Sequence, residues 1–207
     1  MRLYFSLAAS LILATLTPPL AAQAPASGPP PPTAAAPAAM PIPAALIAEQ
    51  RTALDKFARM DGVWRGTAWT LLPNGQKHEI TQTERIGPLL DGSIKLVEGR
   101  GYEPDGRTTF NAFAVISWDA ESKSYRIRSH AQGRYGDFAI RPTDDGYVWE
   151  IPMGPAMMRY TATIRDGVLK EVGDRLAPGR EPLRVFEMVL NRVGDSPWPA
   201  AGAVPVK

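Results

Sequence analysis

Runs in which apolar and polar residues alternate fill most of the chain after residue 62. Tyr, Ile, Ser and Ala alternate with Arg, Arg, His and Gln over residues 125–132, and residues 158–165 alternate in the same way. Such alternation is typical of β-strands with one face against a core and the other in solvent. Turn sequences separate the runs at Asn74-Gly75, Asp91-Gly92, Asp105-Gly106, 119–124, 133–136, Asp145-Gly146, 152–155, Asp166-Gly167 and 178–180. Nine turns predict ten strands.

One segment has helical periodicity instead. From Ala44 to Met60 the apolar residues fall on one side of a 3.6-residue period, and Gly62 follows. Because no second helical segment separates the strands, no crossover can build a parallel sheet, and neighbouring strands must pair antiparallel. An open sheet of ten strands would expose its edges. The sequence therefore predicts an all-β fold: a single up-and-down antiparallel barrel of about ten strands, with one N-terminal α-helix packed on it.

Two of the predicted strands are apolar on both faces. They cover residues 110–116 and 185–190. An apolar outer face needs a cover, since large exposed apolar patches are uncommon on soluble monomers. We expect the N-terminal helix or the second subunit of a homodimer to provide it.

The N-terminal region has the composition of an exported protein. Residues 1–22 resemble a signal peptide, with Arg2, an uncharged apolar run and small residues that favour cleavage after about Ala22. That run is shorter than the ~20 residues of a membrane-spanning helix. Residues 23–43 are almost all Pro and Ala and are expected to form a disordered linker. The helix and barrel then occupy residues 44–193, and 194–207 is expected to be a flexible tail. We predict a periplasmic or secreted protein with no membrane span in its mature form.

Composition excludes several kinds of chemistry. The 207 residues contain no Cys, which excludes a disulfide scaffold, a thiolate metal site and a thiol nucleophile. Two His residues are too few for a three-histidine metal site. The net charge of +2 leaves no strong basic excess, so we expect no nucleic-acid partner. Sequence motifs of nucleotide-binding loops, serine hydrolases and zinc proteases are absent as well.

The two ends of the predicted barrel carry a recognisable pairing. Gly62-Val63-Trp64 opens the first strand, and Arg192 ends the last. This pairing resembles the calycin superfamily, the lipocalins and their relatives, in which a late Arg packs over the Trp of a Gly-x-Trp motif. The resemblance implies that Trp64 is buried and that Arg192 stacks on it.

Further segments are similar to the DUF1579 family. They are residues 61–66, which also look like the opening of nitrobindin-like barrels, and 82–85, 90–92 and 186–188. The likeness covers roughly residues 46–193 and implies a calycin-like barrel. DUF1579 has no established function, so the resemblance adds little about chemistry.

The sequence gives no positive sign of a cofactor. Nitrobindin-like proteins ligate haem through a His late in the chain, whereas no His follows His130 here. Met153, Met157 and Met158 are soft ligands that suit Cu(I), but clustered Met side chains more often pack adaptably at a loop. We therefore expect neither haem, nor copper, nor another metal.

Three residues are weak candidates for acid–base chemistry. His130 shares a strand face with Arg126 and Arg128, and it would form an anion pocket only if that face pointed inward. Glu84 and Glu187 lie in mid-strand. An inward carboxyl group would have a raised pKa and could act as a general acid, whereas an outward one would pair with a neighbouring Arg.

The lumen is the expected binding site. If Trp64 points inward, Gly66 and Ala68 do so as well, and their small side chains leave space that Trp149 and Tyr160 would border. Gly66 also has a second explanation, since glycine in a strand often marks a bend.

These residues lead to one predicted function and two alternatives. The prediction is an exported barrel that binds a small apolar or amphipathic ligand in its lumen. One alternative is a structural or accessory protein with a filled core. The other is a barrel enzyme that uses His130 or an inward Glu as acid or base.

Overall fold

The fold was obtained as a computed structural model, which describes residues 43–196 and 198. The helix α1 (Ala44–Leu54) and the 3₁₀-helix η1 (Asp55–Met60) precede ten strands. The strands are β1 (Gly62–Leu71), β2 (Lys77–Leu89), β3 (Ile94–Tyr102), β4 (Thr108–Asp119), β5 (Ser124–Ala131), β6 (Arg134–Pro142), β7 (Gly146–Met153), β8 (Ala156–Arg165), β9 (Val168–Leu176) and β10 (Leu183–Gly194).

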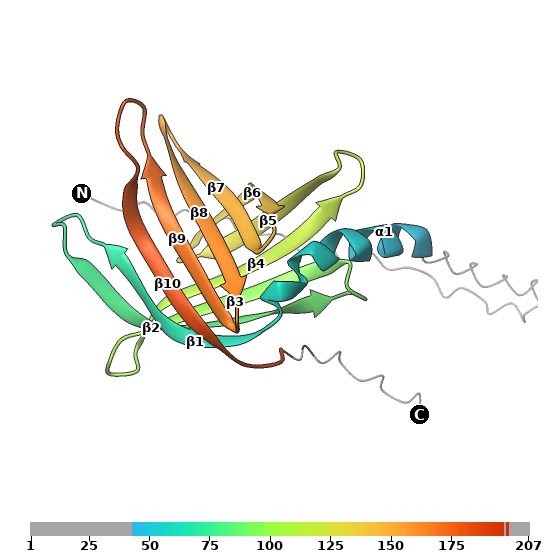
Figure 1. The fold of residues 1–207 in the computed structure, drawn as a ribbon, viewed down its shortest axis with the longest axis horizontal. Helices are drawn as coiled ribbons and strands as arrows, with labels where there is room; N and C mark the ends of the chain where they lie inside the picture. Colours follow the sequence, from blue (N-terminus) through green and yellow to red (C-terminus); the bar gives the residue numbers. More distant parts are fainter. Residues whose placement is uncertain (1–42, 197, 199–207) are drawn as a thin grey trace, which may run out of the picture. The chain divides into compact units, whose positions relative to one another are not determined.

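The strands form one closed antiparallel barrel (Figure 1). Each pairs with its neighbours in sequence, and β1 pairs with β10 to complete the ring. The prediction of an all-β, up-and-down, calycin-like barrel with one N-terminal helix is confirmed. The helix end of the barrel is the end where β1 begins and β10 finishes, and the far end is the opposite one.

Most of the turn signals lie where the sequence placed them. Gly75, Gly92, Gly106 and Gly167 have positive φ, which glycine adopts without strain. Asp145-Gly146 marks the turn between β6 and β7, but Gly146 is already the first residue of β7. A Cβ atom there would lie 2.0 Å from the carbonyl oxygen of Ala162, so this glycine allows close strand contact.

The helical segment closes the helix end of the barrel. Its last six residues are 3₁₀ rather than α-helical, which differs from the single α-helix predicted over 44–60. Phe57 and Met60 are buried in the core, and the Phe57 ring meets Tyr125 edge-on at 5.1 Å. The Tyr125 hydroxyl donates to the carbonyl of Ala53 at 2.9 Å. These contacts join the helical segment to β5.

The helix contacts one of the two doubly apolar strands, β4, at the end of its inward face. It packs on β3 and β4, where the Trp118 indole donates to Glu49 Oε1 at 3.2 Å. On β10, Val189 and Val193 remain exposed. Phe113 on the outer face of β4 is exposed as well, so the helix leaves the outer faces of both doubly apolar strands uncovered.

The Gly-x-Trp motif lies where the barrel closes. Trp64 is 1% exposed, and its indole donates to the Met60 carbonyl at 2.8 Å. Arg192 lies opposite Trp64 in the strand register, and its Nε donates to the Asp61 carbonyl at 3.2 Å. Gly62 has φ +148°, and a Cβ there would lie 2.8 Å from Arg192 Nε. Glycine is required because the chain turns directly beneath this guanidinium.

The expected stacking of Arg192 on Trp64 is not among the cation–aromatic contacts of the described residues. Those contacts are made by Lys77 with Trp69 and by Arg85 with Trp198, each at 3.6 Å from the ring centre. Arg192 instead joins the two chain ends through the Asp61 carbonyl and an ion pair with Asp195.

The chain ends are described only in part. The predicted signal peptide, 1–22, and all of the linker before Pro43 lie outside the described residues. After β10, the Ser196 hydroxyl donates to the Ile86 carbonyl, and Trp198 lies against Arg85. The first residues of the expected tail thus pack on β2. Neither of the two helices in residues 43–196 has the length and apolar character to cross a membrane.

Candidate functional site

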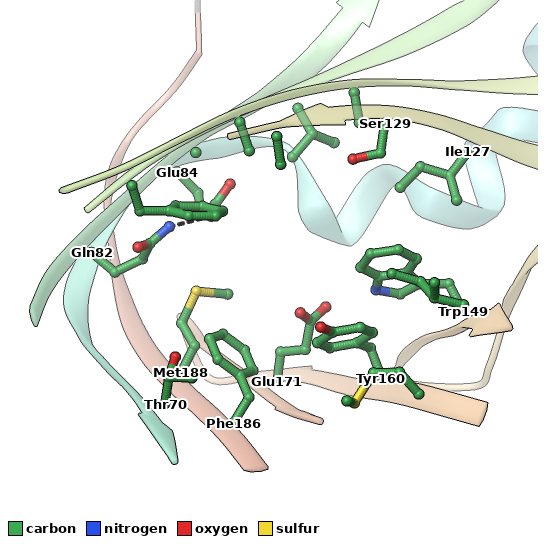
Figure 2. A pocket seen from close by; sticks show the side chains of 18 of the residues that line it. Thr70, Gln82, Glu84, Ile127, Ser129, Trp149, Tyr160, Glu171, Phe186 and Met188 are labelled. Carbon is green, nitrogen blue, oxygen red and sulfur yellow. Dashed lines mark hydrogen bonds between the residues drawn. The ribbon is translucent and has the colours of Figure 1, made fainter. Parts of the chain in front are cut away.

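A cavity of about 570 Å³ occupies the barrel lumen. It extends from Met60 and Leu169 at the helix end to Thr70 and Leu72 at the far end. Thr70 and Leu72 are both exposed, so the cavity reaches solvent-accessible side chains at the far end. Most of the lining is apolar, with a few polar side chains among it (Figure 2).

In one part of the cavity, opposite walls carry side chains of different size. Gly99, Ala112 and Ala131 are paired across β3, β4 and β5, and all three line the cavity. The facing wall, from β7 to β10, carries large aromatic rings. These rings belong to Trp149, Tyr160 and Phe186. Because small residues face the rings, the side chains do not meet across the lumen as they do in a close-packed core.

The aromatic wall is continuous. The rings of Trp149 and Tyr160 are stacked, with centroids 4.5 Å apart and planes inclined at 14°. Tyr160 then meets Phe186 edge-on at 5.9 Å. Such a wall can bind a planar apolar group through stacking and edge contacts.

Glu84 places a carboxyl group in the lumen from β2. Its residue is only 8% exposed, and Oε1 accepts a hydrogen bond from the Gln82 amide at 2.8 Å. A Cβ atom at Gly99 would lie 2.7 Å from Oε1, so the carboxyl group packs over this glycine of β3. No described residue donates a hydrogen bond to Oε2, although the side chain lines the cavity (Figure 2).

Glu171 places a second carboxyl group in the lumen from β9. It is 7% exposed, and the Tyr147 hydroxyl and the Trp149 indole near it act as donors that favour its ionised form. In the strand register, Ala162 of β8 lies between Tyr147 and Glu171. Its methyl group is small enough to let the Tyr147 side chain reach across β8 to the carboxyl group.

Burial makes both groups weaker acids than usual. Loss of hydration raises the pKa of Glu84 from 4.5 to about 8, and the nearby Glu171 charge adds to the effect. Burial likewise raises the pKa of Glu171 to about 7, against the opposing effect of its two hydrogen-bond donors. At neutral pH the lumen therefore holds carboxyl groups that can donate or accept a proton.

The structure separates the predicted site residues into two groups. Trp149 and Tyr160 line the cavity, and so does Glu84. Trp64, Gly66 and Ala68 are not among the lining residues. Ala68 lies opposite Met188 in register, and the longer Met188 side chain reaches the lumen in its place. The cavity thus lies nearer the far end than the sequence indicated.

His130 and Glu187 lie outside the lumen. Ile127, Ser129 and Ala131 line the cavity, so the alternate residues of β5 face outward. His130 stacks on the exposed Tyr135 with ring centres 6.0 Å apart. Glu187 pairs with Lys170 at 3.3 Å and Arg184 at 3.5 Å. Neither residue shares a cavity with the two buried carboxyl groups.

The sequence analysis did not select Glu171 or Gln82 as site residues. The one available signal was the position of Glu171, two residues after Leu169 on the same strand face. Val172 weakens this signal, because an apolar residue beside Glu171 suggests that Glu171 faces solvent. Its donors are on β7, and only the barrel register brings them together.

We predict that Tyr147→Phe raises the pKa of Glu171 by about one unit. The Tyr147 hydroxyl donates to the carboxylate, and a hydrogen bond to the charged form lowers a pKa. The measurement is a carboxyl ¹³C NMR titration of Glu171. Tyr160→Phe is the matched control, because Tyr160 makes no hydrogen bond to Glu171. Equal shifts in the two variants would contradict the assigned hydrogen bond.

Within residues 43–196 and 198, no three His, Asp or Glu side chains gather as a metal-binding group. His78 lies at the cavity margin and contacts Glu103 at 3.2 Å, far along the chain from His130. Comparison with protein-family models and with curated proteins finds no match for this chain. The assignment of the site therefore depends on its geometry.

Proposed function

We propose that the barrel binds a small apolar or amphipathic molecule in its lumen. The observation that carries this proposal is the cavity of about 570 Å³ between the aromatic and small-residue walls. Its size lies within the ~300–1,000 Å³ typical of small-molecule sites. Its lining also has the composition of such sites, mostly apolar with a few polar groups such as Gln82, Glu84 and Glu171.

The same geometry bears on the alternatives. A structural barrel with a filled core has no use for small residues facing an aromatic wall. One specific observation favours a barrel enzyme. The carboxyl group of Glu84 is buried, and its pKa is raised to about 8, which suits a general acid or base. Glu84→Gln separates this candidate from a binding protein, because it abolishes turnover but leaves the binding of an uncharged ligand intact.

Binding in the lumen is tested with N-phenyl-1-naphthylamine, an uncharged dye that fluoresces in apolar surroundings. We expect one dye per chain, with affinity reduced at least tenfold in Ala112→Phe and Ala131→Phe because each ring fills the small-residue wall. Asn111→Phe is the control, since Asn111 is the exposed neighbour of Ala112 on β4. Folded filling variants that bind the dye like the parent would place its site elsewhere.

We also propose that the chain is exported and processed, on the basis of residues 1–22. In a host that exports it, we expect the mature protein to begin at about Gln23. Intact-mass measurement of the protein recovered from the periplasm or medium checks this result. A cytoplasmic chain that retains residues 1–22 would contradict it.

A further inference from the structure

The cavity is lined by two acidic side chains and by no Lys or Arg of the described residues. Its ionisable lining residues are Glu84, Glu171, Tyr147, Tyr160 and His78. His78, at the margin, is already in contact with Glu103. The lumen therefore offers carboxyl groups without a cation of the protein to neutralise them.

The carboxylates on the outer surface of the barrel have different partners. Apart from Glu79 of β2, the mid-strand acidic residues there have a basic partner within ion-pair distance. The pairs are Glu98 with Arg85 and Arg100, Asp137 with Arg126 and Arg128, Glu150 with Arg159, Asp174 with Arg184, and Glu187 with Lys170. The lack of a basic partner thus distinguishes Glu84 and Glu171 from these strand carboxylates, and it coincides with the cavity.

The partners of the two inward groups are all neutral. Gln82 donates to Glu84, and Tyr147 and Trp149 donate to Glu171. The other charges near Glu84 are carboxylates, Glu171 and Glu98, while the Tyr160 phenol lies near Glu171. An anionic ligand would meet repulsion from both Glu side chains once either is ionised, whereas a cation would supply the missing partner.

The aromatic wall favours the same ligand class. Stacked Trp149 and Tyr160, with Phe186 beside them, present ring faces and edges to the cavity. Aromatic rings bind planar apolar groups and also attract cations to their faces. The Trp149 indole favours the ionised form of Glu171, and both side chains line the cavity, so the aromatic wall and one acidic group lie near each other.

Building on the lumen-binding function proposed above, we propose that the ligand is a cationic amphiphile, an amine that carries an aromatic or other planar apolar group. Its ammonium group lies against Glu84 and Glu171, and its apolar body lies on Trp149, Tyr160 and Phe186. Oε2 of Glu84, which receives no hydrogen bond from a described residue, accepts one from the ammonium group.

This ligand class makes binding depend on pH in a defined direction. Burial keeps Glu84 and Glu171 protonated at pH 6 in the empty barrel, because their pKa values are about 8 and 7. An ammonium group stabilises the ionised form, so binding releases protons, and the affinity for an amine rises between pH 6 and pH 8. A neutral ligand of the same shape releases none.

The test compares three molecules of matched shape on the full chain: 2-(1-naphthyl)ethylamine, 2-(1-naphthyl)ethanol and 1-naphthylacetate. Isothermal titration calorimetry in buffers of different ionisation enthalpy gives affinity and proton release together. At pH 7.5 we expect the amine to bind at least tenfold more tightly than the alcohol, with the carboxylate weakest. In E84Q/E171Q we expect the amine to bind no more than about twofold more tightly than the alcohol, whereas E187Q keeps the advantage of the amine.

The possible outcomes distinguish a wrong ligand class from a failure of the proposed lumen-binding function. If the alcohol binds as tightly as the amine, or the carboxylate binds best, the lumen is a binding site but the cationic ligand is wrong. The cationic ligand is also wrong if E84Q/E171Q prefers the amine as strongly as the outward control E187Q does. If none of the three molecules binds, both proposals fall.

Discussion

The double variant E84Q/E171Q is expected to melt about 10 °C above the parent at pH 9 and at nearly the same temperature at pH 5. Both carboxyl groups are buried in the lumen, and their pKa values are raised from 4.5 to about 8 and about 7. A raised folded-state pKa contributes stability that is fully present below the unfolded-state pKa. That stability is lost as the pH rises through the folded-state pKa.

The size of the effect follows from the same values. Each unit of pKa difference corresponds to about 1.4 kcal/mol, so the two groups together lose on the order of several kcal/mol between pH 4.5 and pH 8. For a domain of this size, 1 kcal/mol shifts the melting temperature by about 2–4 °C. Gln is uncharged throughout and keeps a carbonyl oxygen that can accept the hydrogen bond from Gln82.

Thermal melts at pH 5, 7 and 9 measure this result. The melting temperature of the parent should fall as the pH rises, whereas that of the double variant should change little. E187Q is the matched control, because Glu187 is a mid-strand carboxylate that faces outward and pairs with Lys170 and Arg184. If the melting temperatures of E84Q/E171Q and the parent change in parallel with pH, the two carboxyl groups are hydrated, and the lumen admits more water than described.

The fold was largely predictable because its signals are local. A positive-φ glycine in a turn and an alternating strand carry their information within a few residues, and nine such turns leave an up-and-down barrel as the simplest closed arrangement. Gly146 shows what such local signals miss. Its Asp-Gly sequence marks the turn, but the neighbouring carbonyl of Ala162 also requires a glycine for close contact within the ladder.

The site was only partly predictable because it depends on register across many strands. Strand parity put Ile127 and Arg126 on opposite faces of β5, but only the structure shows that Ile127 is the one that lines the lumen. Parity did not predict the position of Ala68 relative to the cavity. Its side chain points inward, but the longer side chain of Met188 beside it lines the cavity instead. Nor did parity identify Glu171, since the residues that hydrogen-bond to it come from a strand more than twenty residues earlier.

Gly66→Ala is expected to lower the melting temperature by about 10 °C or more. A Cβ atom at this position would lie 2.0 Å from the carbonyl oxygen of Val189 and 2.9 Å from Cα of Leu190. Both atoms belong to the backbone of β10, so no side-chain rotation can relieve the overlap. The pair of strands that closes the barrel must separate locally, and overpacking of this kind costs about 3 kcal/mol or more.

Gly194→Ala provides the matched control, because Gly194 also lies at the β1–β10 seam and nothing lies within 4 Å of its would-be Cβ. We expect its melting temperature to change by no more than about 2 °C. The pair also decides between the two explanations of Gly66 given by the sequence. If Gly66→Ala melts like Gly194→Ala but loses binding of N-phenyl-1-naphthylamine, the glycine makes room for a ligand. If it melts far lower, as we expect, the glycine permits the close contact of strands on which closure of the barrel depends.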